Sequence, residues 1–532
     1  MREKMFTNQR FRKYSWSSLQ RDLLAGVIVG IVAIPLAMAF AIASGVKPEY
    51  GIYTTIVAGF LAALFGGSRF QVVGPTGAFV PMLFGIVMQY GYQQLLIAGC
   101  LAGVILIMMG LFRLGTWIQF IPRPVTIGFT AGIAVIIFFG QISAFLGLDI
   151  QKQGQSFVTK LLIMINHAHT FDIWSLLTAC ICLTVILLLQ HFWPKLPAPI
   201  IGLVLSASVA YLFYPGKVST IGSLFGGFPS SLPSFTWLPI SIDNVINLLV
   251  PAMLIAFLGG IESLLSAHVA DEMSGDKHHS NRELIGQGIA NVVTPFFGGI
   301  PATGAIARTA TNIRSGAISP LSSMIHSLFV LCTLLFFAPF AVHVPLASMA
   351  PILMVVAWKM SERKKFQQLL QMKTSDSLVL CVTFLLTVLA DLTIGVLAGI
   401  ILSMLIFMIR MGKCHIRSIE LDKTPSDIGI YSLEGPVYFG SVKQLMNSIQ
   451  AHPEHQKVIL MMDHVPYLDT TGVTVMTKIR DQFQDRGIEL VVSGLRSQPK
   501  SVLMSTENWK TYDSPIEAIE SVNMKEILTQ VE

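Results

Sequence analysis

Long apolar runs without a charged residue dominate the first 410 positions of the chain. Five of them have the length of one pass: Leu23–Val46, Tyr50–Ser68, Pro124–Leu148, Ile173–Pro194 and Leu196–Gly216. A membrane-spanning helix needs about 20 mostly apolar residues. Phe70–Phe112 and Ser315–Trp358 are too long for one pass, so each predicts at least two spans. With half-length helices allowed, the pattern predicts 14 membrane segments ending near Arg410.

Charge separates this region from the remainder of the chain. Residues 1–412 contain 24 basic and 14 acidic side chains, whereas residues 413–532 contain 12 basic and 16 acidic ones. Charged residues therefore make up 38/412, about 9%, of the first part and 28/120, about 23%, of the second, against about 25% in soluble proteins. We expect a basic tail at 1–21, an α-helical polytopic membrane domain at 22–412 and a soluble domain at 413–532.

The basic residues also predict the orientation in the membrane. Arg113 and Arg123 follow the fourth predicted span, residues 271–283 follow the eighth, and Lys359 to Lys365 follow the twelfth. Cytoplasmic loops carry the excess of Lys and Arg, so both termini are expected in the cytoplasm and the protein in the cell (inner) membrane. The same rule accounts for the net charge of the membrane part without nucleic-acid binding. The cysteines lack paired spacing, and no metal or cofactor is expected.

A short repeat occurs at corresponding places in the two halves of the membrane part. Gly74–Ala78 (GPTGA) recurs as Pro301–Ala305 (PATGA), and the shared Thr-Gly-Ala lies 227 residues apart. The copies fall in the third and tenth predicted segments, both interrupted by Gly and Pro. Seven spans in each half imply opposite orientations, and paired interrupted segments point to a transporter site. We therefore expect a 7+7 inverted repeat, with repeats at about 22–216 and 243–412.

Unwound backbone followed by a short helix presents free N–H groups, and these favour an anion. Two such half-helices meeting inside the membrane would form an anion cradle without a formal charge. The candidate residues are Thr76, Gly77, Ala78, Gly304, Ala305 and Ile306. The alternative is that Gly and Pro only kink ordinary membrane helices.

Glu262 is an ionisable residue within an apolar stretch. It follows 18 uncharged residues, Asn244–Ile261, and precedes eight more. Ionisable groups inside a span are costly and are functional by default. Glu262 is a candidate proton carrier, with the hydroxyls of Ser263 and Ser266 beside it. The alternative is a glutamate at a helix end that reaches water.

Arg308 lies four residues after Gly304, so helical spacing places it on the same face. Three roles are open: a counter-ion for the substrate, a partner for Glu262, or a basic residue at the cytoplasmic edge alongside Arg314.

The tail has the pattern of an α/β domain. Ile428–Leu433, Val437–Phe439, Val458–Met462 and Ile488–Val492 are expected strands. A helix is expected from Thr470 to about Gln484, with Asp469 as its N-cap.

These residues resemble the sulfate permease (SulP/SLC26-type) family of anion transporters, with a tail similar to the anti-sigma-factor antagonist (STAS) domain. The motifs are Pro35–Ala39 (PLAMA), Gly51–Tyr53 (GIY), Phe65–Arg69 (FGGSR) and Gly74–Thr76 (GPT). The resemblance implies 14 spans in a core and a gate domain, a homodimer, and elevator-type movement of the core. Leu36 departs from the glutamine that is common there.

The second half is similar to bacterial proton-linked carriers of four-carbon dicarboxylates, through Ile261–Leu265 (IESLL) and Ala305–Arg308 (AIAR). Sodium-coupled bicarbonate members have aspartate at the position of Glu262 and threonine at that of Ile306. The resemblance therefore favours a proton over sodium. Thr471 matches the residue that is phosphorylated in sigma-factor antagonists.

The sequence as a whole predicts a secondary active transporter for a small anion, sulfate-class or dicarboxylate, coupled to a proton, and not an enzyme. A sodium-coupled bicarbonate transporter, an anion exchanger and a channel of the same fold are the alternatives. A membrane-anchored signalling protein with a STAS-like switch is the alternative from another class. The expected partners are the anion, the proton, the lipid bilayer, a second copy of the chain, and a cytoplasmic protein for the tail.

Overall fold

The computed structural model describes residues 15–116, 122–150, 157–193, 196–390, 392–411, 414–419, 428–438, 456–506, 509–514, 516–518 and 520. The chain divides into two compact units, Met1–Ile400 and Ile401–Glu532. The division falls inside the last apolar helix, α18 (Leu392–Met411).

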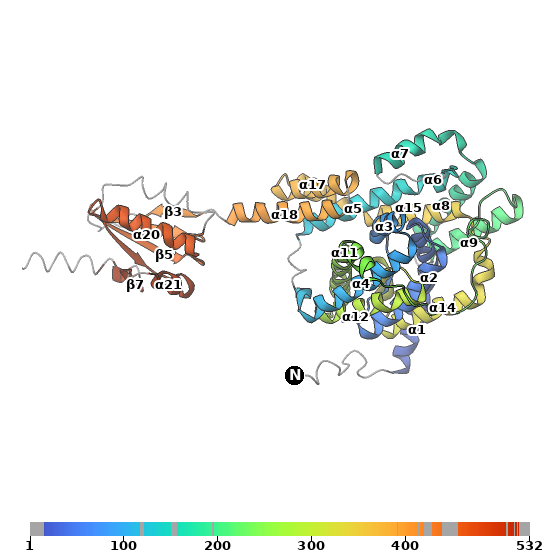
Figure 1. Ribbon diagram of the computed structural model, residues 1–532, viewed down its shortest axis with the longest axis horizontal. Helices are drawn as coiled ribbons and strands as arrows, with labels where there is room; N and C mark the ends of the chain where they lie inside the picture. The colour runs from blue at the N-terminus through green and yellow to red at the C-terminus, as the bar shows by residue number, and fades with distance from the viewer. Residues whose placement is uncertain are drawn as a thin grey trace, which may run out of the picture. The chain divides into compact units, whose positions relative to one another are not determined.

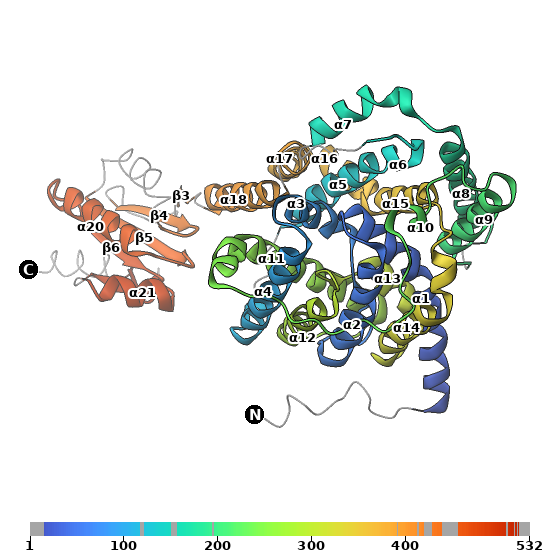
Figure 2. The ribbon, with the colours of Figure 1, turned by 45° about the vertical axis from the view of Figure 1, so that its right-hand side comes forward.

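One helical bundle of the first unit combines segments from both halves of the chain. From the first half come α1 (Trp16–Ala43), α2 (Pro48–Phe65), α3 (Val80–Tyr90) and α4 (Tyr92–Leu111); from the second come α11 (Ile242–Ser274), α12 (Ser280–Val293), α13 (Ile306–Arg314) and α14 (Leu321–Ala341). α1 packs on α2 and α14, while α4 packs on α11 and α12 (Figures 1 and 2). We call this group of helices the first bundle.

The remaining helices form a second bundle. It contains α5 (Arg123–Gly140), α6 (Ile142–Leu146), α7 (Phe157–Asn166), α8 (Ile173–Phe192), α9 (Ala198–Phe213), α15 (Leu346–Met360), α16 (Arg363–Gln371) and α17 (Ser375–Leu389). α15 packs on α5 and α8, and α17 packs on α5 (Figure 2). The short α10 (Ile221–Phe225) lies in the connection to α11, and single 3₁₀ turns are η3 (Gly77–Phe79), η4 (Leu114–Thr116), η6 (Ala168–Thr170) and η7 (Thr294–Phe297).

Helix length and hydropathy support many membrane crossings. In the described part of the chain, seven helices are long and apolar enough to span, and five shorter apolar helices accompany them. α12 is not among them because it has only 14 residues and several of these are polar. One of the polar residues, Glu283, accepts hydrogen bonds from the backbone N–H groups of Gly67 (2.7 Å) and Ser68 (2.9 Å). The count of 14 and the inverted repeat stay predictions.

The second unit contains a five-stranded sheet of order β3-β4-β5-β6-β7. Its strands are β3 (His415–Ser418), β4 (Ile428–Glu434), β5 (Lys457–His464), β6 (Glu489–Ser493) and β7 (Thr511–Tyr512). β3 is antiparallel to β4, and the other pairs are parallel. α20 (Thr470–Gln484) and α21 (Ser497–Met504) contribute Met476 and Leu503 to the core on one face.

The structure confirms most of the expected tail elements. β4, β5, β6 and α20 lie where the pattern places them. The expected strand Val437–Phe439 is wrong: Val437 forms only an isolated bridge with Leu468, and Phe439 lies outside the described residues.

Candidate functional site

Two very short strands cross at the centre of the first bundle. β1 (Val73–Gly74) and β2 (Thr303–Gly304) pair antiparallel, with Val73 opposite Gly304 and Gly74 opposite Thr303. Thr76 then begins η3 and α3, while Ala305 begins α13. The two interrupted segments therefore meet through Val73–Gly74, which precede the first Thr-Gly-Ala, and Thr303–Gly304, which begin the second. A helix N-terminus follows each of them.

The backbone N–H groups of the six candidate cradle residues differ in availability. Gly304 N–H donates to Ser263 Oγ (3.0 Å) and Ala305 N–H donates to the Val72 carbonyl (2.9 Å). These two groups are therefore not the free donors that the sequence argument expects. The first N–H groups of a helix have no acceptor within it, which leaves Gly77 and Ala78 at η3, and Ile306 at α13, as the backbone donors of a cradle.

Glu262 faces this crossing from α11. Thr76 Oγ1 donates a hydrogen bond to Glu262 Oε2 (3.1 Å). Glu262 lies well inside α11 and its side chain is half-buried, so the alternative of a helix-end glutamate is wrong. A change in the charge of this carboxyl would act on the residue that begins η3.

Ser263 and Ser266, which are expected beside the proton carrier, are both fully buried. Ser263 Oγ bonds Thr303 Oγ1 (3.1 Å) and Ser266 Oγ donates to Thr309 Oγ1 (3.3 Å). The two serines therefore attach α11 to β2 and α13. This arrangement favours a positioning role over a direct role with the proton.

Arg308 lies in the first turn of α13, with 2% of its surface exposed. Its Nη2 donates to the Pro75 carbonyl, while no protein partner for Nη1 occurs among the described residues. Burial excludes the role of a basic residue at the cytoplasmic edge. Arg308 and Glu262 interact electrostatically, and they contact adjacent residues, Pro75 and Thr76. A guanidinium with a free donor beside two helix N-termini suits an oxyanion.

Comparison with known proteins identifies the family of each of the two parts of the chain. The sulfate permease family model matches residues 19–383, and the STAS domain model matches residues 418–511. The chain belongs to the sulfate permease family. A Bacillus subtilis (strain 168) protein named "Putative sulfate transporter YvdB" is 49% identical over 505 residues, which cover 93% of this chain and 95% of that protein.

More distant members of the family carry other names. The "Bicarbonate transporter BicA" of Picosynechococcus sp. is 26% identical over 533 residues, covering 94% of this chain and 92% of that protein. The murine "Slc26a9" anion transporter structure superposes with a TM-score of 0.87 at 17% identity, covering 98% of this chain and 93% of that one. At that identity the likeness establishes the fold, which is a helical membrane transporter with a STAS domain.

Two buried polar residues near the crossing were missed by the sequence argument. The side-chain amide of Gln71 lies where a Cβ on Gly304 would be, and His326 on α14 is fully buried. Neither the Gln71 amide atoms nor the His326 ring nitrogens have a protein partner in the described part of the chain. Both residues are polar positions within apolar runs, which is the signal that identified Glu262.

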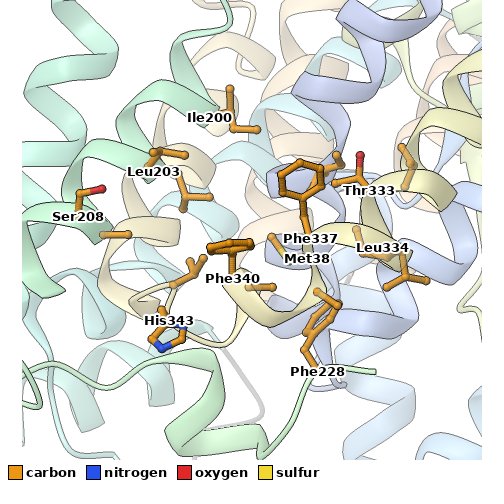
Figure 3. A pocket seen from close by; sticks show the side chains of 18 of the residues that line it. Met38, Ile200, Leu203, Ser208, Phe228, Thr333, Leu334, Phe337, Phe340 and His343 are labelled. Atoms are coloured by element: carbon orange, nitrogen blue, oxygen red, sulfur yellow. The ribbon is translucent and has the colours of Figure 1, made fainter. Parts of the chain in front are cut away.

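A cavity lies between the two bundles, and its lining is mainly apolar, in contrast to the polar β1–β2 crossing. It has a volume of about 560 Å³, and its walls come mainly from α1, α14 and α9. Figure 3 shows Met38, Leu203, Phe337 and Phe340 among the apolar side chains that line it, with His343 at one end. A small hydrated anion has few hydrogen-bond partners there, so we do not assign the substrate to this cavity.

The STAS-like unit presents the residues around Thr471 at the start of α20. Asp469 caps the helix by accepting the Gly472 N–H (2.6 Å), as the sequence predicts. Thr471 is exposed. Its accessibility is compatible with phosphorylation, which stays a prediction.

Proposed function

We propose that this protein is a secondary active transporter that moves a sulfate-class anion together with a proton across the cell membrane. The observation that supports this most directly is the meeting of two helix N-termini at the β1–β2 crossing, with the buried guanidinium of Arg308 beside them. Helix N-termini and arginine both stabilise negative charge. The crossing is the centre of the first bundle, so a bound anion would lie within protein and away from lipid.

The donor set favours a compact oxyanion. Gly77, Ala78 and Ile306 contribute backbone N–H groups, and Arg308 contributes Nη1. The Thr76 hydroxyl, which donates to Glu262, becomes a donor to the anion once Glu262 is protonated. Several directional donors around one small volume fit the oxygens of sulfate. The 49% identity to a protein named as a sulfate transporter supports the same class. A four-carbon dicarboxylate would need a second anchoring point for its distal carboxylate.

Glu262 is the proposed proton carrier. In its ionised form it would repel an anion bound at Thr76, whose hydroxyl it already holds at 3.1 Å. Protonation removes that repulsion, and by reciprocity the bound anion favours protonation. Anion and proton would therefore be loaded together. The positions of Glu262 and Ile306, where sodium-coupled bicarbonate relatives have aspartate and threonine, support a proton rather than sodium.

The division of the helices into two bundles supports the proposal of an elevator-type mechanism. Every residue of the proposed site lies in the first bundle, on η3, α11 and α13. The second bundle contacts the first along α1 and α3, mainly through α15, α9 and α5. We propose that the first bundle carries the anion and proton across the membrane while the second stays fixed and mediates homodimer formation. Both termini would then be cytoplasmic, and the STAS-like unit would be the place where a cytoplasmic protein binds or Thr471 is phosphorylated.

Uptake by the purified protein in proteoliposomes tests this function. Radiolabelled sulfate, succinate and bicarbonate are compared under an imposed proton gradient and an imposed sodium gradient. We expect saturable sulfate uptake that an inward proton gradient accelerates and that sodium leaves unchanged. A requirement for sodium, or a preference for bicarbonate or succinate, contradicts the proposal. Ion currents far above carrier turnover would indicate a channel instead.

A further inference from the structure

A second, smaller cavity lies beside the half-helix that follows the cradle. Its volume is about 150 Å³, and it is lined by α1 and α3 of the first bundle and by α5, α6 and α7 of the second. Val80 and Phe84 line it from α3, while Gln141 and Ser143 line it near α6. The volume corresponds to roughly five water molecules, which is sufficient for a small oxyanion.

Lys160 on α7 is the basic residue of this cavity. Its Nζ lies 4.2 Å from the centre of the Phe84 ring, a cation–π contact. Among the described residues that line the cavity, no Asp or Glu occurs and no other Lys or Arg. A half-buried ammonium group without a carboxylate partner loses hydration that an incoming anion can replace.

We propose that Lys160 forms an outer anion-capture site from which the substrate proceeds to the cradle. The donors would be the Lys160 ammonium, the Gln141 amide and the Ser143 hydroxyl, and the ligand would be a small oxyanion. This inference rests on the proposed transport function and extends it. In the proposed topology, α7 and the end of α3 face the outside of the cell.

The position of the cavity supports this route. Val80 directly follows η3, so the cavity begins two residues beyond Ala78 of the cradle. Ile137 lines the cavity, and its Cδ1 would lie 3.0 Å from a Cβ on Gly77. Ile137 therefore stands between the two sites. A single cation at such an entrance raises the local anion concentration, and movement between the bundles would displace Ile137.

Transport measured separately on each face of the membrane tests the inference. The variants are Lys160→Gln, Lys160→Arg and, as a matched control, Lys217→Gln, which removes an exposed lysine from the loop after α9. In right-side-out vesicles we expect Lys160→Gln to raise the KM for sulfate about five- to tenfold with Vmax unchanged. Lys160→Arg should keep most of the affinity, and Lys217→Gln should match the wild type. In inverted vesicles the KM should be unaffected.

An unchanged KM at the outer face would overturn the inference. A fall in Vmax with unchanged KM would also overturn it, because Lys160 would then act as a latch on Phe84 rather than as an anion site. Absence of sulfate uptake by the wild type would count against the proposed function and not against the cavity.

Iodide quenching tests the cavity independently of transport. Ile163 lies one turn after Lys160 and also lines the cavity. The chain has seven native tryptophans, so the quenching of a tryptophan at Ile163 is taken as the difference between the Ile163→Trp protein and its parent, and this difference reports on anions near Lys160. Adding Lys160→Gln to Ile163→Trp should lower the quenching constant for iodide about two- to threefold and leave quenching by neutral acrylamide unchanged. Equal iodide quenching in both proteins would contradict the capture site.

Discussion

A methyl group added at Gly74 should displace Arg308 without altering Arg308 itself. A Cβ at Gly74 would lie 2.6 Å from Arg308 Nη1, where ordinary contact begins at 3.4 Å, so the guanidinium must retreat by about 0.8 Å (3.4 − 2.6). This shift disrupts its hydrogen bond to the Pro75 carbonyl and misplaces the free Nη1 donor. Hydrogen bonds to charged groups contribute about 1.5–3 kcal/mol.

That free energy corresponds to a roughly 10- to 100-fold rise in the KM for sulfate. The assay is sulfate uptake by Gly74→Ala in proteoliposomes over a range of sulfate concentrations. Gly85→Ala is the matched control, because Gly85 lies on the adjoining α3 and a Cβ there meets no atom within 4 Å. Thermal unfolding in detergent should give similar midpoints for both variants. A folded Gly74→Ala protein with wild-type KM would refute the assignment of Arg308 to the anion.

Three further predictions concern the proton, the helix cap and the buried thiol. Glu262→Gln should retain sulfate exchange but lose its acceleration by an inward proton gradient; uptake that still follows the gradient would place coupling elsewhere. Asp469→Ala removes the acceptor of the Gly472 N–H and should cost the isolated 413–532 segment about 1 kcal/mol in urea unfolding; an unchanged midpoint would show that the cap is dispensable. Burial raises the pKa of the Cys414 thiol to about 11, so the folded segment keeps a proton that the unfolded chain releases. Its unfolding free energy should therefore fall as pH rises from about 9 to about 11, and Cys414→Ala should reduce that fall; identical pH profiles for the two proteins would contradict it.

The part of the site that the sequence predicts is the part encoded in local backbone chemistry. Thr-Gly-Ala with its neighbouring prolines interrupts both apolar runs in which it occurs. The two interrupted segments meet where β1 (Val73–Gly74), just before the first copy, pairs with β2 (Thr303–Gly304) in the second. Glu262 is identifiable because an ionised group in an apolar helix needs a functional reason. Local sequence also predicts the tail strands β4 and β5, because they are apolar runs bounded by polar turns. β7 has only two residues, too few to form a recognisable pattern.

Contacts between distant segments could not be predicted. The N–H of Gly304 is satisfied by Ser263, and that of Ala305 by the Val72 carbonyl from the other half of the chain. Which helix N-terminal donors remain free depends on these pairings and not on local sequence. Arg308 could not be placed for the same reason, because its partner is the backbone of Pro75.

Locating a bound anion directly is the decisive measurement for the cradle. Selenate has the shape and charge of sulfate, and its anomalous scattering identifies it in crystals of the protein. The account predicts selenate between the first turns of η3 and α13, within hydrogen-bond distance of the Arg308 guanidinium and the Gly77 and Ile306 N–H groups. Selenate bound elsewhere, with this position empty at concentrations that saturate transport, would contradict it.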